Sequence, residues 1–265
     1  MGRSLLFPSL RSGNATGVLL RAWTAFKSTS WATVASGFME PVLYLLAMGM
    51  GMGALVGDVV GPDGNPMSYA AYIAPALLTT SAMNGAVYES TWNVFFKLRF
   101  GKIYQVMLQT PMGPMDIALG EVGWALLRGL AYGVAFMVVA FVMGLVTSLW
   151  ALLMVPVALL VALGFAGFGM GITSYLTNFR QMDVVGFVML PMFLFSATLY
   201  PITVYPEWIQ WVVKVMPLWH GVELMRGLSI GYVTWGSLGH LAYFLVMAGV
   251  GLTLMTLRLR KLFLR

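Results

Sequence analysis

Long runs of hydrophobic residues, separated by short polar segments, dominate the sequence. A helix crosses a hydrocarbon core of roughly 30 Å with about 20 residues, and six runs reach or approach that length. With ends placed to within a few residues, the runs are Thr33–Val56, Tyr69–Asn93, Ile117–Val146, Leu149–Tyr175, Val184–Tyr200 and Ser237–Leu257. This pattern predicts an all-α membrane protein with six transmembrane helices.

The composition supports the same class. Of the 265 residues, 60% are hydrophobic and only 9% are charged, which is too few to give a water-soluble domain its polar surface. The chain has no cysteine, which excludes disulfides and thiolate metal sites. Its net charge of +6 is spread over loops and termini, which favours anionic lipid headgroups over nucleic acid as the neighbours of the basic residues.

The positions of the basic residues predict the orientation. Twelve of the 15 basic residues share one side of a six-span protein: Arg3, Arg11, Arg21, Lys27, Lys97, Arg99, Lys102, Arg180, Arg258, Arg260, Lys261 and Arg265. The opposite loops hold Asp58, Asp63, Glu207 and Glu223 with Lys214 and Arg226. By the positive-inside rule both termini are cytoplasmic, and we expect a multi-pass protein of the bacterial inner membrane without a cleaved signal peptide.

Residues 16–30 precede the first run and are too polar to cross the membrane. Leu19, Trp23 and Phe26 recur in this segment at helical spacing, with the basic residues elsewhere. The spacing predicts an amphipathic helix on the inner membrane surface. An ordinary juxtamembrane segment whose cations snorkel to the headgroups is the alternative.

A basic segment separates the second and third runs. Its apolar positions recur on one face of a predicted helix: Phe96, Phe100, Ile103 and Met107. Its polar positions recur on another: Arg99, Lys102, Gln105 and Gln109. Prolines and glycine at 111–114 end the helix before Asp116, which is placed to cap the third span. The result is a short, rigid, two-faced helix that either transmits force from a cytoplasmic partner into both spans or simply anchors a loop.

Five polar residues lie within the predicted spans, where a charge at mid-bilayer costs roughly 2.5–3.5 kcal/mol. They are Glu40, Asn84, Glu89, Glu121 and Arg128. Glu40, near the cytoplasmic end of its span, is either hydrated or paired. Arg128 follows Glu121 by about 10.5 Å of helical rise, so Glu40 or Glu89 on a neighbouring helix is better placed as its counter-ion. The group either fixes helix packing or handles substrate or protons.

Prolines at 201, 206 and 217 break the chain between the fifth and sixth runs into short, aromatic pieces. This predicts a broken hairpin that re-enters the outer leaflet. Its candidate exit residues are Trp208, Trp211, Trp219, His220, Glu223 and Arg226. The tryptophans are either interfacial anchors or a stacking surface for a departing substrate. His220 and His240 are far apart in sequence, and we assign them no metal chemistry.

Small residues at four-residue spacing predict close helix contacts in lipid. The pairs are Gly49 with Gly53, Gly167 with Gly171, and Ala162 with Ala166. They serve either packing within the subunit or sliding of helices during transport.

Several segments resemble the membrane-spanning subunit of ABC-2 type exporters, in particular the nodulation-factor (NodJ-like) lipo-oligosaccharide exporters and related drug-resistance permeases. The segments are "MEPVLYLLAMGMGMG" from Met39, "YIAPALL" from Tyr72, "MNGAVYEST" from Met83, "FGKIY" from Phe100, "DIALGE" from Asp116, "LPMFLFS" from Leu190, "PEWIQW" from Pro206 and "PLWHGVELMRG" from Pro217. They recur in order over residues 20–230, so the resemblance covers the whole subunit.

The resemblance implies that the transport pathway and ATP hydrolysis belong to different subunits. Two copies of the chain, or one with a similar permease, would form a pore above two separate ATPase subunits. The segment from Phe96 to Thr110 would be the coupling helix, with contacts from Phe96, Arg99, Phe100, Lys102, Ile103, Tyr104 and Met107. ATP and Mg²⁺ would be bound by the ATPase, since the chain has no G-x-x-x-x-G-K-[ST] loop.

We therefore expect one ABC-2 type transmembrane domain over residues 1–265. Residues 1–30 form its cytoplasmic segment and interface helix, 31–257 its six spans, and 258–265 a basic tail. The expected function is ATP-driven export of an amphiphile, such as a lipid-linked oligosaccharide, lipid or hydrophobic drug. The chain would be no enzyme, without catalytic, cofactor or metal site of its own.

Two alternatives belong to other classes. A proton-coupled transporter would use Glu89, Glu121 and Arg128 as a relay. A membrane enzyme acting on lipid-linked sugars would need an acid–base set, for which His220 with Glu223 is the one nearby candidate.

Overall fold

The computed structural model describes residues 14–27 and 31–263. The predictions for residues 1–13, 28–30 and 264–265, which include the basic residues Arg3, Arg11 and Arg265, lie outside the described residues.

Helices make up most of the described chain. In sequence order the elements are α1 (Ala15–Lys27), α2 (Trp31–Leu46), η1 (Ala47–Met52), α3 (Gly53–Val56), β1 (Asp58–Val60), β2 (Pro66–Ser68), α4 (Tyr69–Tyr88), η2 (Glu89–Asn93), η3 (Phe96–Phe100), α5 (Ile103–Met107), α6 (Pro114–Val142), η4 (Leu149–Leu153), α7 (Met154–Thr173), η5 (Phe179–Met182), α8 (Asp183–Phe195), η6 (Ile202–Val204), α9 (Glu207–Val215), α10 (Pro217–Ile230) and α11 (Trp235–Phe263). The first three η segments are π-helical turns and the last three are 3₁₀ turns.

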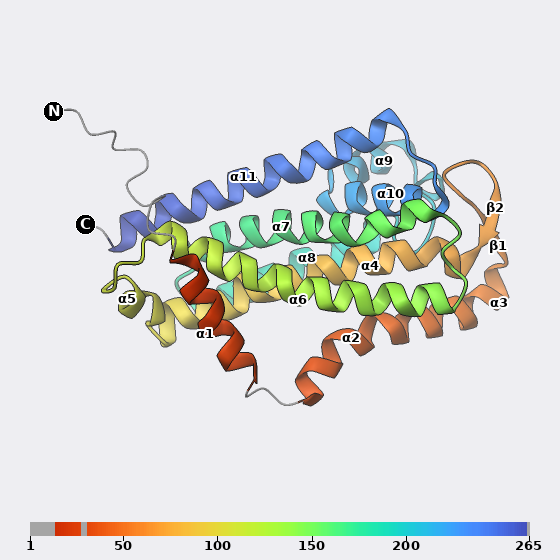
Figure 1. Ribbon diagram of the computed structural model, residues 1–265. Helices are drawn as coiled ribbons and strands as arrows, with labels where there is room; N and C mark the ends of the chain where they lie inside the picture. Colours follow the sequence, from red (N-terminus) through yellow and green to blue (C-terminus); the bar gives the residue numbers. More distant parts are fainter. Residues whose placement is uncertain (1–13, 28–30, 264–265) are drawn as a thin grey trace.

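The long helices lie side by side in an elongated bundle (Figure 1). The short helix α5, the start of α6 and the C-terminal part of α11 lie at one end, which we call the α5 end. The strands β1 and β2 lie at the other, the β end, with α9 and α10 toward the same end. Such an arrangement lets side chains from distant parts of the sequence meet at the same depth of the bundle.

Four helical stretches in the described residues are long and apolar enough to cross a membrane. They are Met39–Val56, Pro114–Val142, Leu149–Thr173 and Trp235–Arg258, which correspond to the first, third, fourth and sixth predicted spans. The second predicted span forms the continuous helix α4–η2, and the fifth forms α8, with 13 residues. The helical membrane-protein class is confirmed, and the count of six spans stays a prediction.

Two spans end earlier than predicted because the backbone turns left-handed. The helix α6 stops at Val142, and Gly144 after it has φ +70°. This is the conformation that glycine adopts most readily after a helix. The helix α8 stops at Phe195, two residues before Ala197 with φ +55°.

The core is centred on α7, which packs closely against α11. A Cβ atom on Gly251 of α11 would lie 2.2 Å from the carbonyl carbon of Gly167, and one on Gly171 would lie 3.3 Å from the Gly251 carbonyl oxygen. The predicted small-residue row at Gly167 and Gly171 therefore serves packing within the subunit. Gly49 similarly faces Ala70 of α4, with 3.1 Å between the two Cβ positions.

The N-terminal helix α1 crosses the outside of α6 near the α5 end (Figure 1). Its buried residues are Val18 and Ala22, and Val18 fits over Gly120, where a Cβ atom would lie 2.4 Å from that of Val18. Trp23, predicted to face the membrane, is 47% exposed and packs its edge against Trp124 of α6. The helix exists as predicted, but its best-buried side faces α6; its contact with a membrane surface stays a prediction.

The all-α prediction missed a small antiparallel hairpin at the β end. Strands β1 and β2 pair with Asp58 opposite Ser68, and the turn includes Gly64 with φ +82°. The sequence "GPDGN" at Gly61 is rich in residues that favour turns, and it was the available signal.

The chain between α8 and α11 is broken as predicted, although re-entry into a membrane stays untested. Helices α9 and α10 meet at Met216, whose extended backbone precedes Pro217. Most of α10 is buried in the bundle, where Gly221 lies against Thr79 of α4. By contrast α9 exposes Trp208 and Trp211.

Candidate functional site

A cavity of about 470 Å³ lies between α2, α4 with η2, α6 and α8. Four of the five predicted intramembrane polar residues line it: Glu40, Asn84, Glu89 and Arg128. Thr80, Ser81, Asn84 and Tyr88 recur at helical spacing, so that one face of α4 supplies much of the polar wall. The side chains that the sequence placed in separate spans therefore meet in one place.

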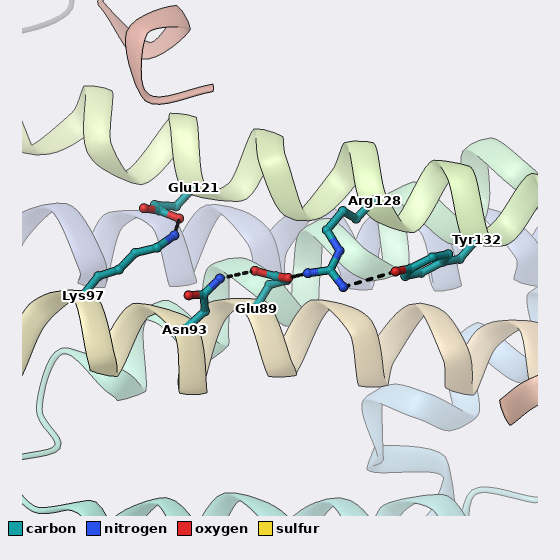
Figure 2. Close-up of polar contacts among 6 residues, drawn as sticks. All are labelled: Glu89, Asn93, Lys97, Glu121, Arg128 and Tyr132. Carbon is teal, nitrogen blue, oxygen red and sulfur yellow. Dashed lines mark hydrogen bonds and ion pairs between the residues drawn. The ribbon is translucent and has the colours of Figure 1, made fainter. Parts of the chain in front are cut away.

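An ion pair forms the deeper part of this wall. Arg128 of α6 donates from Nη1 to Glu89 Oε1, and its Nη2 donates to the Tyr132 hydroxyl at 3.2 Å (Figure 2). Asn93 Nδ2 donates to Glu89 Oε2 at 2.6 Å. Of the two counter-ions considered for Arg128, the structure therefore selects Glu89. Single π-turns such as η2, which begins at Glu89, are common where a helix presents functional side chains.

The other two predicted intramembrane polar residues that line the cavity have no such partners. Glu40 and Asn84 make no hydrogen bond or ion pair with any described residue, and Glu40 is exposed. The helix α2 begins at Trp31, so Glu40 lies about 13 Å along it, farther from the helix start than expected.

The wall formed by α8 is apolar. Gly186, Met189, Leu190 and Phe193 face the cavity from this helix. Leu77 of α4 and Ala125 of α6 add apolar surface beside the polar residues of their own helices. A site of this size and mixture suits a small amphiphile, because ligand sites of roughly 300–1,000 Å³ combine apolar walls with a few polar groups.

Glu121 does not belong to the cavity. It pairs with Lys97 of η3, with 2.6 Å between Nζ and Oε2, and both side chains are nearly buried (Figure 2). Trp124 faces α1, where its ring lies 5.4 Å from that of Phe26. Glu121, Trp124 and Arg128, which follow one another at intervals of three and four residues along α6, thus contact three different neighbours. Among the described residues no hydrogen bond joins the Lys97–Glu121 pair to the Glu89–Arg128 pair, so the three residues of the proton-relay alternative belong to two separate networks.

The predicted coupling helix over Phe96 to Thr110 is not one helix. The helix that begins at α4 continues to Phe100, and Lys102 then adopts a left-handed conformation with φ 47°. A separate turn, α5, follows from Ile103 to Met107. The break separates the two predicted faces, because residues before and after it no longer share a helical axis.

The predicted coupling residues divide by exposure. Phe96, Phe100 and Lys102 are exposed, and Ile103 is half-buried. Tyr104 and Met107 are buried in the core, so their predicted contact with a partner stays a prediction that their burial does not favour. Burial raises the pKa of the Tyr104 hydroxyl well above its usual value, and the nearby Glu121 carboxylate adds to the rise.

Arg99 has a structural contact inside the chain. Its Nε and Nη2 both donate to the carbonyl oxygen of Leu176, at 3.1 and 2.7 Å. The side chain therefore fastens η3 to the segment after α7 and has fewer donors free for a partner. The exposed rings of Phe96 and Phe100 lie beside it, and Phe96 contacts Phe179 with 5.9 Å between ring centroids. Phe96, Phe100 and Lys102 form what we call the corner patch.

The predicted exit residues do not form one surface. Trp208 and Trp211 are exposed on α9, whereas Arg226 is only 2% exposed. Arg226 donates to Glu223 Oε1 at 3.0 Å and to the Ala197 carbonyl oxygen at 2.9 Å, and its guanidinium lies 3.8 Å from the centroid of Tyr72. The pairing of Glu223 with Arg226 leaves no acid–base set with His220, which weakens the enzyme alternative.

The two histidines, thought too isolated to interact, are in contact. His220 Nδ1 and His240 Nδ1 are 2.7 Å apart, and the Tyr243 ring stacks on His220. No sequence signal pointed to this, since α10 and α11 bring together positions 20 residues apart. Among the described residues no three His, Cys, Asp or Glu side chains gather as metal ligands would.

Comparison with known proteins agrees with the resemblance seen in the sequence. The pattern of the ABC-2 type transporter family matches residues 16–230. Nodulation protein J of Rhizobium leguminosarum bv. trifolii is 29% identical over 253 residues, which cover 95% of each chain. The protein of the same name from Sinorhizobium fredii (strain NBRC 101917 / NGR234) is 32% identical over 214 residues, or 80% of each chain. That of Rhizobium meliloti (strain 1021) is 28% identical over 219 residues, or 82% of each chain.

These matches confirm the predicted kinship along most of the chain. They include the segments that supply the cavity, its ion pair and the corner patch. The protein belongs to the ABC-2 type transporter family.

Proposed function

We propose that the chain is the permease subunit of an ATP-driven exporter that moves an amphiphile across the bacterial inner membrane. Membership of the ABC-2 type transporter family, over residues 16–230, is the observation that carries the proposal. The half-polar, half-apolar cavity supports it, because an amphiphile needs both kinds of wall. The relatives named nodulation protein J make a lipid-linked oligosaccharide one candidate substrate.

In this proposal the chain has six spans, with both termini in the cytoplasm. The α5 end then faces the cytoplasm, in keeping with its Lys97, Arg99, Lys102 and Lys261. Two copies, or one copy and a similar permease, enclose the pathway in the lipid bilayer. Two ATPase subunits bind ATP and Mg²⁺ below them.

The corner patch is the part of the chain that we expect to meet the ATPase. Exposed aromatic side chains beside a cation are typical of protein contact sites. The patch lies where the helix from α4 ends, and α4 carries the polar wall of the cavity. Force on the patch would therefore move the cavity wall along a single helix, and the Lys97–Glu121 pair would carry part of it into α6.

Replacing Phe100 by Ser tests this route. Phe100 is 64% exposed, so we expect the variant to fold normally but to lose most ATPase binding, measured by pull-down, and most substrate-stimulated ATP hydrolysis. The matched control is Trp208→Ser, an exposed aromatic residue on α9 toward the β end, which should leave ATPase binding unchanged.

Reconstitution tests the function itself. Vesicles holding the chain with its ATPase should concentrate an amphiphile only when ATP is hydrolysed. Uphill transport by the chain without any ATPase, abolished by a protonophore, would instead favour the proton-coupled alternative. The separation of the Glu121 and Glu89 networks gives that alternative less support.

A further inference from the structure

The charges around the cavity do not balance. Its lining holds three charged side chains, Glu40, Glu89 and Arg128. Glu89 and Arg128 neutralise one another in their ion pair. Glu40 is left as a carboxylate without a partner among the described residues. The cavity thus has a formal charge of −1 and offers no unpaired cation.

Aromatic rings add to the preference for positive charge. Tyr44, Tyr88 and Tyr132 all line the cavity. The ring of Tyr132 already lies 5.7 Å from the Arg128 guanidinium, which shows that the cavity accommodates a cation over a ring. Tyr44 and Tyr88 are 49% and 61% exposed, so their faces remain accessible. A cation gains about 0.5–2 kcal/mol from such a ring, and the gain is larger when water is excluded.

The arrangement of the walls orients the rest of the ligand. Glu40 and Tyr44 belong to α2, whereas Met189, Leu190 and Phe193 of α8 form the apolar wall. A molecule with its charge beside Glu40 can therefore lay an apolar body along α8. The unpaired carboxylate of Glu40 attracts a cation and repels an anion, and its exposed position leaves it within reach of a ligand that enters the cavity.

We propose that this cavity selects amphiphiles with a monovalent cationic headgroup, such as a lipophilic ammonium or phosphonium ion, through Glu40 and the neighbouring tyrosines. The proposal rests on the proposed export function, because it names the substrate class of that transport. It is stated for binding by the chain itself, which needs no ATPase.

Tetraphenylphosphonium and tetraphenylborate provide the test, since they share size and shape but differ in the sign of their charge. The full chain is placed in nanodiscs of zwitterionic lipid, and binding of each ion is measured by equilibrium dialysis against chain-free nanodiscs. We expect saturable binding of tetraphenylphosphonium and no saturable binding of tetraphenylborate. Equal binding of both ions, or binding of neither, would overturn the proposal.

Variants then assign the charge preference to named groups. Glu40→Gln should weaken tetraphenylphosphonium binding several-fold, as expected for loss of one exposed electrostatic partner. Glu40→Asp should retain most of the affinity, and the exposed acid Glu207, changed to Gln on α9, is the matched control with no expected effect. Tyr44→Leu should weaken binding several-fold, whereas Tyr44→Phe should not. Unchanged affinity in Glu40→Gln would refute the role of Glu40.

Failure of this inference is distinguishable from failure of the proposed function. ATP-dependent transport of an amphiphile without charge-selective binding would overturn this inference but not the export function. Charge-selective binding without ATP-dependent transport would overturn the export function but not the cation site.

Discussion

Among the described residues Arg226 is the largest fully buried side chain, although its sequence position suggested an outer loop. Its charge is tolerated because Glu223, the Ala197 carbonyl and the Tyr72 ring all face the guanidinium. A buried charge is stable only with such partners. Arg226 therefore fastens α10 to α4 and to the turn after α8, which explains why it cannot belong to an exit surface.

The ion pair in the cavity provides a prediction at the same scale. Arg128→Met leaves the nearly buried Glu89 carboxylate with Asn93 as its remaining partner among the described residues, so we expect a loss of roughly 1–3 kcal/mol of stability. The double variant Glu89→Gln/Arg128→Met should recover much of this loss, because no unpaired charge remains. The midpoint of thermal unfolding in detergent measures both effects.

The exposed Lys214 of α9 supplies the control, since Lys214→Met removes a cation without stranding a buried acid. A double variant no more stable than Arg128→Met would show that the pair contributes nothing through its charges.

At the scale of elements, the contact between α7 and α11 depends on the absence of side chains. Gly167 and Gly251 let the two backbones touch in a region where lipid offers no hydrophobic drive for helix association. Helix α11 is also long, with 29 residues. Its apolar outward-facing surface can contact lipid, so it needs no other helix to cover it. The close contact makes this pair of helices a rigid unit against which α4, α6 and α10 pack.

Gly251→Ala should separate these helices. The added Cβ would lie 2.2 Å from the Gly167 backbone, which cannot shift as a flexible side chain would. We expect a loss of about 1–3 kcal/mol, by the usual cost of overpacking, read from the thermal unfolding midpoint. Gly249→Ala is the matched control, since nothing lies within 4 Å of its Cβ position and alanine favours helix. Equal stability of the two variants would mean that the helices pack less closely than described.

For the whole molecule, the absence of cysteine makes the proposed orientation directly testable. Single cysteines are introduced at Asp63, in the turn between β1 and β2, and at Lys102, in the corner patch. A membrane-impermeant maleimide should label Asp63→Cys in spheroplasts without an outer membrane, and Lys102→Cys only after the inner membrane is permeabilised. Labelling of both positions from outside would contradict a membrane crossing by α4–η2, the predicted second span between them.

Much of the element order could be predicted because the length and polarity of a segment limit its place in a bilayer. The four candidate spans, the broken segment before α11 and the helix at α1 all follow from such local properties. The coupling segment failed because helical periodicity alone does not reveal a break. Lys102 turns left-handed after Gly101, and the continuing pattern of apolar residues hides that turn.

The sequence predicted four polar residues of the candidate site, but not which of them pair with one another. Glu40, Asn84, Glu89 and Arg128 stand out because charged and amide groups are costly in lipid. Which acid meets Arg128 depends on how α4 and α6 are rotated against each other, and no single helix carries that information. The contact of His220 with His240 arises in the same way from the packing of α10 on α11.

The sequence by itself determined the membrane class, most of the expected spans and the polar groups that need partners inside the membrane, because these depend on transfer of each segment from water to lipid. The family followed from the resemblance of its segments to those of known exporters. Only the tertiary structure decided that Glu89 pairs with Arg128, Lys97 with Glu121, and that Glu40 stays alone in a cavity walled by α8. The physical reason is that a helix fixes which of its residues share a face, whereas the neighbour of each face is set by packing among all the helices at once.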